Sequence, residues 1–266
     1  MSRWSSKPVA IHVGHGSVQV RDPATPLPAA PAAPFDPDAA RGDARGLEAV
    51  LQAVLGGSGA VTRGADFEIA TACCRFEVVG WVDGVTSREH RAALARGRFE
   101  AVYGSAARDW RIEVAEGGYR RGALAVALPT PMLPAILGAC RRAGVRPASI
   151  RPAAGACIDR LLRKAAGGAA WLVVPDRSDT FIGLVDRGSW LAALCMPIGA
   201  DRMLAGLADV LARESALVAE ELAGARVLVC PSSSGAAGGR SIGQARPDNR
   251  VLEGGDQRWP LEWLDH

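Results

Sequence analysis

The sequence predicts an α/β protein built from two related lobes, each organised around an antiparallel hairpin or meander of strands. Three short apolar runs, at 171–174, 180–185 and 190–194, are separated by the polar segments PDRSD and DRGS. Runs of this length between turn-forming residues are typical of consecutive antiparallel strands. Helical periodicity flanks them at 133–164 and 201–222. We therefore expect a three-stranded meander at the centre of one lobe.

A shorter hairpin opens the chain. Val9–Val13 and Ser17–Arg21 flank Gly14-His15-Gly16, and glycine suits the positive φ values that tight hairpin turns require. A Pro-rich loop follows at 22–41, with six prolines within 22–38. Because proline cannot sustain helix or sheet ladders, we expect this loop to be extended, mobile and free of core contacts.

Strands and helices then alternate through the first half of the chain. Apolar side chains at helical or strand spacing, bounded by glycine and capping residues, support each element. We first expect a helix over 47–55 and a strand over 67–82 that bends or splits near Cys73-Cys74. A helix capped by Ser87 follows, with an apolar face of Leu94, Phe99 and Val102. The last element of this half is a hairpin of 110–114 with 124–128.

The same reasoning applies to the second half. Thr130 is a suitable N-cap, Pro131 suits the first turn of a helix, and Gly144 suits its end. We expect further a strand at 147–151, a helix at 153–164, the meander, the helix at 201–222 and a strand at 226–230, followed by a Gly/Ser-rich loop.

These elements suggest an N-terminal lobe at 1–128 with a small insert at 84–118, and a C-terminal lobe at 129–240. A polar tail occupies 241–266 and ends in Trp259 and Trp263 with neighbouring leucines. The tryptophan-rich end either packs back on a lobe or forms a short docking motif.

Composition excludes several classes of protein. With 266 residues and 48% apolar content the chain is globular. The net charge of +3 is small, and no basic stripe with interleaved aromatics indicates nucleic-acid binding. No run approaches the ~20 apolar residues of a membrane span, and the N-terminus lacks a signal core. We expect a cytoplasmic protein whose six cysteines, without a CxxC pair, are buried reduced thiols.

Common catalytic motifs are absent from the sequence. His12 and His15 point in different directions in a hairpin, so no zinc site is expected. No GxSxG, GxGxxG or P-loop ending GK[ST] occurs. The Gly/Ser segments 56–59 and 232–239 are turn-like loops.

The order of these segments resembles one family. AIHVGHGSVQV (10–20), AVALPTPMLPAILGACRRAGVRPASIRPAAGACIDRLL (125–162), WLVVPDRSDTFIGLVDRGSWLAALCMPIGAD (171–201) and RVLVCPSSSGAAGG (226–239) are similar to successive segments of the actin-like assembly proteins of bacterial type IV pili and type II secretion, the PilM family and the cytoplasmic part of GspL. The resemblance covers roughly residues 8–240. It implies a two-lobed actin-like (ribonuclease H-like) ATPase fold, with mixed sheets flanked by helices.

The resemblance also implies a nucleotide site, which this sequence alters. The implied cofactor-binding positions are Gly14, Gly16, Ser17, Asp176, Ser178 and Gly235. His12 stands where the family has an Asp for hydrated magnesium, and Pro175-Asp176-Arg177 replaces Asp-x-Gly. Magnesium prefers hard oxygen ligands, and an Arg side chain crowds a phosphate turn. Asp176 could assume the missing role only by shifting its strand by one residue.

We therefore expect a non-catalytic scaffold, a pseudo-ATPase that binds Mg-ATP weakly or not at all and holds no metal. The resemblance implies as partners an inner-membrane pilus or secretion assembly protein and the assembly ATPase, which would place the protein peripherally at the inner membrane. A second copy of the chain is a further expected partner. An active ATPase or small-molecule kinase of the same superfold is the alternative. An interaction module unrelated to pili is a third hypothesis, because function depends on the site and not on the fold.

Overall fold

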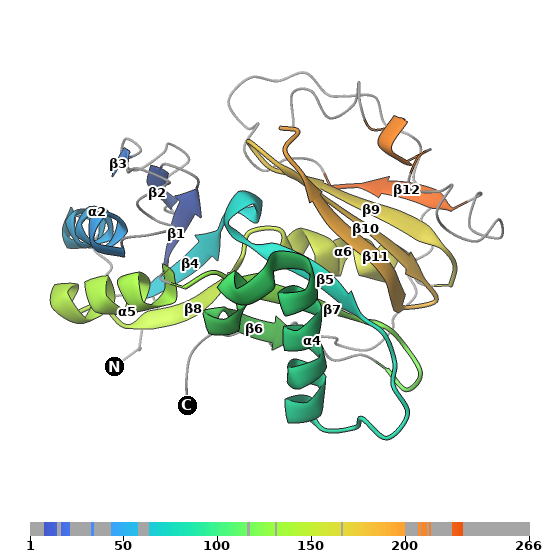
Figure 1. Ribbon diagram of the computed structural model, residues 1–266. Helices are drawn as coiled ribbons and strands as arrows, with labels where there is room; N and C mark the ends of the chain where they lie inside the picture. Colours follow the sequence, from blue (N-terminus) through green and yellow to red (C-terminus); the bar gives the residue numbers. More distant parts are fainter. Residues whose placement is uncertain are drawn as a thin grey trace, which may run out of the picture.

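The computed structural model describes residues 8–14, 17–21, 33–34, 44–57, 64–115, 118–130, 132–165, 167–199, 207, 209–211, 213 and 225–230. The strands of these residues form three sheets, with strand orders β3-β2-β1-β4-β8, β5-β7-β6 and β11-β10-β9-β12. Figure 1 shows the first sheet on the left, the second in the lower centre and the third on the right. The described residues contain no helix long and apolar enough to span a membrane.

The first sheet mixes antiparallel and parallel pairs. β1 (Val9–Gly14) pairs antiparallel with β2 (Ser17–Arg21), as predicted, and parallel with β4 (Ala65–Ile69). β4 in turn pairs parallel with β8 (Pro147–Pro152). Both crossovers pass through helices, as parallel connections require. The first sheet therefore contains strands from two distant parts of the chain.

Two helices pack on each other beside this sheet, α2 (Ala44–Gly57) and α5 (Met132–Ala143) (Figure 1). Leu47, Leu51 and Leu55 are fully buried, and their four-residue spacing puts them on one side of α2. α5 ends at Gly144, whose φ of 64° is easy only for glycine, and the amide of Val145 donates back to the carbonyl of Cys140. The end of α5 agrees with the prediction.

The second sheet is inserted between β4 and α5. Its elements are η1 (Thr71–Cys73), β5 (Arg75–Val79), α4 (Arg88–Tyr103), η2 (Gly104–Asp109), β6 (Arg111–Val114) and β7 (Ala123–Leu128). η1 splits the expected long strand at Cys73, and the Ser87 hydroxyl accepts the predicted capping bond from the amide of His90 at 3.1 Å. Every residue of β7 is buried.

Successive side chains of β7 point to opposite faces of the sheet, so this strand contributes to two apolar cores. Ala125 and Ala127 contact the core of the insert, which includes Phe99 of α4. Leu124, Val126 and Leu128 point the opposite way, as period-2 geometry requires, into a central core that extends into both lobes. The small alanines let α4 lie close to the sheet on one face.

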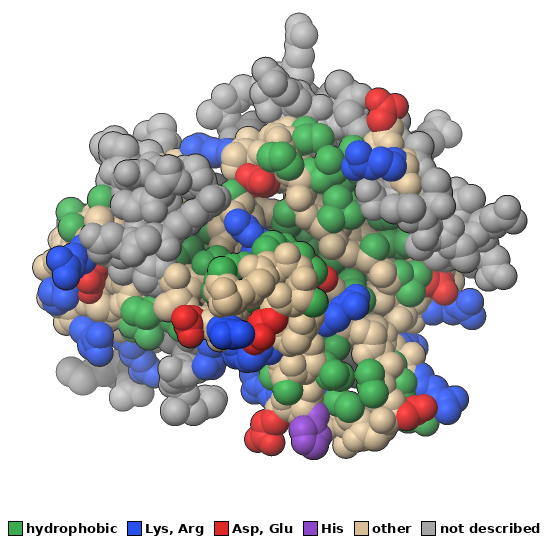
Figure 2. All heavy atoms as spheres, viewed as in Figure 1, with side chains coloured by type: hydrophobic (Ala, Val, Ile, Leu, Met, Phe, Trp, Pro, Cys, Tyr) green, Lys and Arg blue, Asp and Glu red, His purple; other side chains and the backbone are tan. Residues whose placement is uncertain are grey.

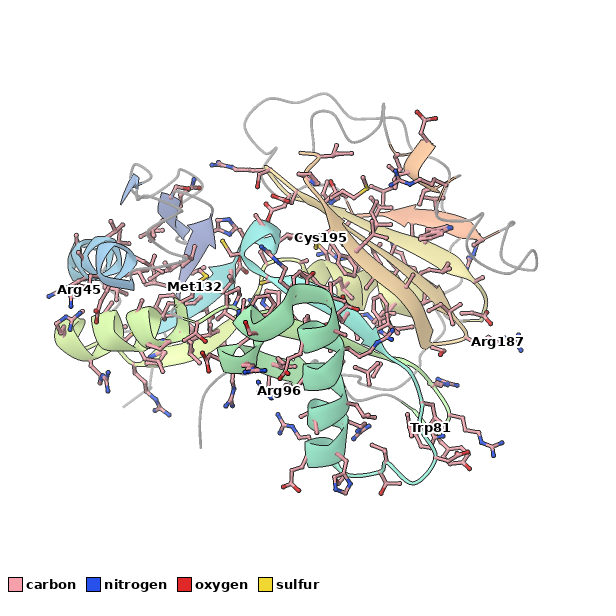
Figure 3. All side chains as sticks on the ribbon, viewed as in Figure 1. Arg45, Trp81, Arg96, Met132, Arg187 and Cys195 are labelled. Carbon is pink, nitrogen blue, oxygen red and sulfur yellow. The ribbon has the colours of Figure 1, made fainter. Side chains whose placement is uncertain are left out.

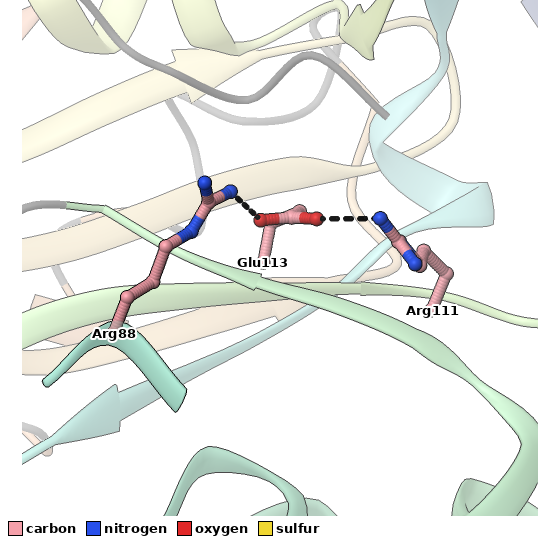
Figure 4. Close-up of polar contacts among 3 residues, drawn as sticks. All are labelled: Arg88, Arg111 and Glu113. Atoms are coloured by element: carbon pink, nitrogen blue, oxygen red, sulfur yellow. Dashed lines mark hydrogen bonds and ion pairs between the residues drawn. The ribbon is translucent and has the colours of Figure 1, made fainter. Parts of the chain in front are cut away.

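A buried carboxylate braces the insert. Glu113 of β6 is 7% exposed and lies 2.8 Å from Arg88 at the start of α4 and 3.3 Å from Arg111 (Figure 4). The two guanidinium groups supply the positive charge that a desolvated carboxylate requires. This contact fixes the first turn of α4 on the sheet.

The third sheet is the predicted meander extended by one parallel strand. β9 (Ala170–Pro175), β10 (Thr180–Asp186) and β11 (Ser189–Met196) pair antiparallel in order, and β12 (Arg226–Val229) pairs parallel with β9. α6 (Gly155–Ala165) connects β8 to β9 and packs against β9 and β12. Each lobe thus has an antiparallel hairpin or meander extended by parallel strands, as expected.

Several local expectations differ from the structure. The Pro-rich loop contributes β3 (Ala33–Pro34), which pairs with β2. β3 is an edge strand, where proline is tolerated because no ladder bond is lost. Val102 is 59% exposed, because Ala95 and Phe99 supply the buried side of α4. The Thr130 hydroxyl, expected to cap α5, donates to the carbonyl oxygen of Asp109.

The pairing of β8 with β4 also bears on the division into lobes. The expected boundary after residue 128 does not coincide with the edge of the first sheet, because residues 147–152 lie within that sheet. The second sheet begins and ends outside the expected insert at 84–118. We propose a first lobe that extends through residue 152 and contains an insert at 71–128. Most of the expected helix at 201–222, and the tail at 241–266, lie outside the described residues.

Candidate functional site

The two lobes meet where the carboxyl ends of their parallel strands face each other. In the first sheet these ends are Gly14 of β1, Ile69 of β4 and Pro152 of β8, and in the third sheet they are Pro175 of β9 and Val229 of β12. Ligands of open α/β sheets bind outside the carboxyl ends of the strands. A functional site is therefore expected at this junction.

Asp176 joins the lobes at this junction. Its carboxylate Oδ2 accepts a hydrogen bond from the backbone amide of Thr71 at 3.0 Å, and Oδ1 accepts one from the amide of Arg177 at 2.8 Å. The Asp176 amide donates to the carbonyl of Asp179 at 2.8 Å and closes the β9–β10 turn. Both carboxylate oxygens are thus engaged by main-chain donors.

The first hairpin reaches the same point through the main chain. The amide of Ala70, next to Thr71, donates to the carbonyl of Val13 at 2.8 Å. Gly14 and Ser17 are paired across the hairpin. Two hydrogen bonds therefore connect the end of β1, by way of Ala70-Thr71, to Asp176. The sequence did not single out Thr71, since no motif marks it.

His12 occupies the interior of the first sheet. It is 5% exposed and lies in register with Gln19 of β2 on one side and Glu68 of β4 on the other. A Cβ on Gly14 would lie 3.6 Å from His12 Nε2 and 3.4 Å from Ser17 Oγ. This end of the hairpin is therefore closely packed.

A row of polar residues continues from His12 across the sheet. Glu68 is in register with Arg151 of β8, and their side chains form an ion pair at 3.4 Å. Asp159 of α6 lies near Arg151, and burial raises the pKa of Asp159 to about 6 although Arg163 and Arg151 act in the opposite direction. The sequence alone did not single out Glu68 and Arg151, because only the parallel pairing of β4 with β8 brings them together.

Apolar side chains fill the junction beside Asp176. Phe76 of β5 packs on Phe181 of β10 with ring centroids 4.9 Å apart, and Phe181 packs edge-on against Trp190 of β11 at 6.1 Å. These rings belong to the central core, which is continuous from Ile11 in the first sheet to Leu172 in the third. The lobes are therefore joined by a shared core.

The insert also contacts the second lobe. The Trp190 amide donates to the carbonyl of Gly122 at 3.1 Å, and the Gly122 amide donates to the Ser189 hydroxyl at 2.9 Å. At the other end of β11, Cys195 lies where the lobes meet (Figure 3). Burial raises the pKa of the Cys195 thiol to about 12, so it is a neutral core group.

The structure brings together only part of the predicted nucleotide site. Gly14, Ser17 and Asp176 lie around the junction, whereas Ser178 is an exposed residue of the β9–β10 turn. Gly16 and Gly235 lie outside the described residues. Within the described ranges, no group of three or more His, Cys, Asp or Glu side chains is arranged to hold a metal ion.

Comparisons with known proteins identify structures with a similar fold. No protein-family model matches the chain, and no curated protein matches its sequence. Two solved structures have a TM-score of 0.50. The cytoplasmic domain of EpsL, an inner-membrane component of the type II secretion system of Vibrio cholerae, is 12% identical over 85% of this chain and 83% of its own. A Bacteroides thetaiotaomicron protein with an actin-like ATPase fold and unknown function is 11% identical over 86% and 94%.

The fold is actin-like. This confirms the fold class expected from the sequence. A third similar structure, the PilM–PilN type IV pilus biogenesis complex, has a TM-score of 0.47 and 12% identity over 80% of this chain and 69% of that one. In this fold the junction described above lies between the two lobes, and the Thr71–Asp176 hydrogen bond crosses it.

Proposed function

We propose that this protein is a non-catalytic scaffold of a bacterial type II secretion or type IV pilus assembly platform. The observation that carries this proposal is the engagement of Asp176 by two main-chain amides, one from each lobe. In this proposal the Asp176 carboxylate occupies main-chain donors between the lobes that a nucleotide phosphate would otherwise use. In this proposal Gly14, Gly16, Ser17, Asp176, Ser178 and Gly235 mark a degenerate nucleotide site.

The residues around the junction support loss of magnesium chemistry. His12 offers imidazole nitrogen on β1, and magnesium selects oxygen ligands. Glu68, the carboxylate in register with His12 on the neighbouring strand, is paired with Arg151 at 3.4 Å. Recruiting Glu68 or Asp176 to a metal would break an existing contact. Among the described residues at the junction, neither Glu68 nor Asp176 is therefore free to bind magnesium without losing a contact.

Glu68 also defines the competing function, an active ATPase or small-molecule kinase. It places a carboxylate beside β1 without any shift of strand register. In that case magnesium would be held by Glu68 in place of the expected β1 aspartate. Nucleotide binding would then depend on Glu68 and not on His12.

The partner is an inner-membrane assembly protein in this proposal, and the protein is held at the membrane through it. The support is the fold shared with the cytoplasmic domain of an inner-membrane secretion component. Lobes joined by a common apolar core offer a fixed surface, which suits docking better than a cycle of opening and closing. On the face shown in Figure 2, basic side chains are interspersed with acidic ones.

Calorimetry tests the proposal. Titration with ATP, with and without magnesium, is expected to give no magnesium-dependent binding, and phosphate release should equal that of buffer. Micromolar magnesium-dependent affinity that is abolished by Glu68→Gln, or by Asp176→Asn, but retained by His12→Ala would establish the enzyme instead. For the partner, the cytoplasmic segment of a short bitopic membrane protein encoded beside this gene should bind the wild type and the nucleotide-site variants equally. A segment that binds none of them would contradict the scaffold.

A further inference from the structure

A shallow cleft on the surface of the insert is not used by the proposed function. Its walls are the end of β5 with the loop that follows, the first half of α4, and the start of β7 with the turn before it. The apolar lining comes mainly from four side chains, Trp81, Val82, Val85 and Leu94. The empty space of about 290 Å³ includes the part open to solvent, so the cleft is shallower than pockets that enclose a small molecule. It suits the side chains of a docked segment instead.

Apolar side chains at the rim of this cleft are exposed, although their backbone is fixed. Tyr119 is 73% exposed and Val82 is 45% exposed. The Tyr119 ring packs edge-on against Trp81, with ring centroids 5.1 Å apart. The turns at 82–85 and 118–121 are each closed by a main-chain hydrogen bond of 3.1 Å. Figure 3 shows Trp81 at the outer edge of the molecule, beyond β5. Exposed apolar side chains that gather beside a cleft are typical of a contact surface.

Positive charge surrounds the cleft. Arg91 and Arg121 are the charged residues that line it, and Arg120 precedes Arg121 in the turn at its edge. Among the described residues, no ion pair engages any of these three arginines. The Asp83 carboxylate nearby already accepts an indole N–H at 2.9 Å. The cleft therefore suits an apolar side chain that has carboxylates beside it, because guanidinium groups bind carboxylates strongly.

The tail of the same chain has the complementary composition. Residues 251–266, VLEGGDQRWPLEWLDH, carry four carboxylate side chains and one arginine. Trp259 and Trp263 are its aromatic residues, and Glu262 and Asp265 lie close to Trp263 in the sequence. Tryptophan is enriched at the centres of interfaces, where one large ring supplies much of the binding energy. This segment therefore offers both the apolar anchor and the negative charge that the cleft suits.

The chain is long enough to bring the tail to the cleft. The sequence places 28 residues, rich in Gly and Ser, between Cys230 and Trp259. A chain of this length and composition has an average end-to-end distance of about 30 Å, compared with a radius of gyration of about 18 Å for a domain of this size. The cleft also lies beside the third sheet, which contains β12, since a Cβ on Gly188 would be 2.8 Å from Arg121 Nη1.

We propose that this cleft binds the tryptophan-rich tail of the same chain. Trp263 packs on the apolar lining, and the neighbouring carboxylates of Glu262 and Asp265 pair with Arg91 and Arg121. The inference is independent of the scaffold function, because neither the cleft nor residues 251–266 include a residue of the junction between the lobes. A tail held in this way covers the exposed apolar rim and neutralises its positive charge.

Titration with a labelled peptide of residues 256–266 tests the proposal on the full-length protein. Trp259→Ala combined with Trp263→Ala in the protein's own tail should leave the cleft open, and this altered-tail variant should bind the peptide with micromolar affinity. The wild type should bind the peptide at least about tenfold more weakly, because its own tail competes at a high effective concentration. Fluorescence anisotropy measures both affinities.

Substitutions in the cleft identify the binding site. In the altered-tail variant, Tyr119→Ala and Arg121→Glu should each weaken peptide binding about tenfold. Because Tyr119 is 73% exposed, its replacement should leave the melting temperature unchanged. Arg141→Glu, at the exposed end of α5, is the matched control and should bind the peptide as before. A peptide with Glu262→Arg should bind the Arg121→Glu protein more tightly than the unaltered peptide does.

Hydrogen exchange shows whether the tail binds within one chain. Amides of residues 118–121 should exchange more slowly in the wild type than in the altered-tail variant, to an extent independent of protein concentration. Protection that rises with concentration would assign the cleft to the tail of a second copy and overturn the proposal. No peptide binding to the altered-tail variant, or binding unchanged by Tyr119→Ala and Arg121→Glu, would also overturn it.

Discussion

The backbone amide of Thr71 donates a 3.0 Å hydrogen bond to the carboxylate of Asp176, although 105 residues separate them in the chain. This contact attaches the end of β4 to the turn after β9, so one carboxylate side chain links the two lobes. Hydrogen bonds to charged groups are among the stronger polar contacts in proteins.

Replacing Asp176 tests the strength of this contact. Asp176→Ala should lower the free energy of unfolding by about 1.5–3 kcal/mol, because the Thr71 and Arg177 amides lose a charged acceptor. Asp176→Asn keeps one oxygen and should cost less. The urea midpoint measures both variants. Asp186→Asn, in the exposed β10–β11 turn, is the control and should leave the midpoint within error. Equal midpoints for all four proteins would show that Asp176 does not hold the lobes.

At Gly122 the insert lies close against the main chain of the second lobe. A Cβ there would lie 2.3 Å from the carbonyl oxygen of Trp190. Because that oxygen belongs to the main chain, Gly122→Ala should destabilise the protein by about 1–3 kcal/mol, as overpacking does. Gly80→Ala is the matched control, since no atom lies within 4 Å of its Cβ position. Thermal unfolding of both variants provides the comparison, and an unchanged melting temperature for Gly122→Ala would show that this contact yields easily.

The carboxylate of Glu113 offers a test of the brace within the insert (Figure 4). Glu113→Gln keeps the shape but removes the charge that Arg88 and Arg111 contact, and we expect a loss of about 1–2 kcal/mol. Glu100→Gln is the control, because the Glu100–Arg108 pair is 3.9 Å apart and solvent-exposed. Hydrogen exchange at α4 should accelerate in Glu113→Gln only. Equal exchange in both variants would mean that packing of Phe99 alone holds α4.

Asp159 should make stability depend on pH. Burial raises its pKa from 3.8 to about 6, so the folded chain favours the protonated carboxyl. Its stabilising contribution is present below pH 4 and is lost as pH rises through about 6. Asp159→Asn, which cannot ionise, should therefore be more stable than the wild type at pH 8 and similar to it at pH 4. Urea titrations at the two pH values measure the difference. A difference of the same size at both would assign the effect to packing.

Local sequence was sufficient for most elements of the fold. Three signals determine the backbone of only a few neighbouring residues: the glycines around the first turn, the polar segments between the strands of the meander, and Ser87 as a helix cap. The elements that they predicted are confirmed. The pairing of β8 with β4 was not predictable, because a parallel crossover leaves no local signal that identifies its partner. The same pairing is the reason for the proposed boundary after residue 152, and the expected boundary after residue 128 was drawn without it.

Some residues of the candidate site were predictable from the sequence and others were not. His12 and Asp176 were found from the sequence because the resemblance supplied positions to compare. Thr71 and Glu68 were missed, since a main-chain amide has no residue signature and Glu68 gains meaning only from its neighbours across the sheet. Sequence reasoning supplied the candidate residues, whereas the structure supplied the contacts that these residues make.

The position of the insert has a consequence for folding on the ribosome. β4 comprises residues 65–69. Its neighbour β8 comprises residues 147–152 and is therefore synthesised only after the whole insert. The insert has its own apolar core around Phe99 and pairs only its own strands. Domains fold as units as the chain is made. The core around Phe99 can therefore form while the surrounding lobe still lacks its last strand, and the other face of β7 is covered only later, when both lobes are present.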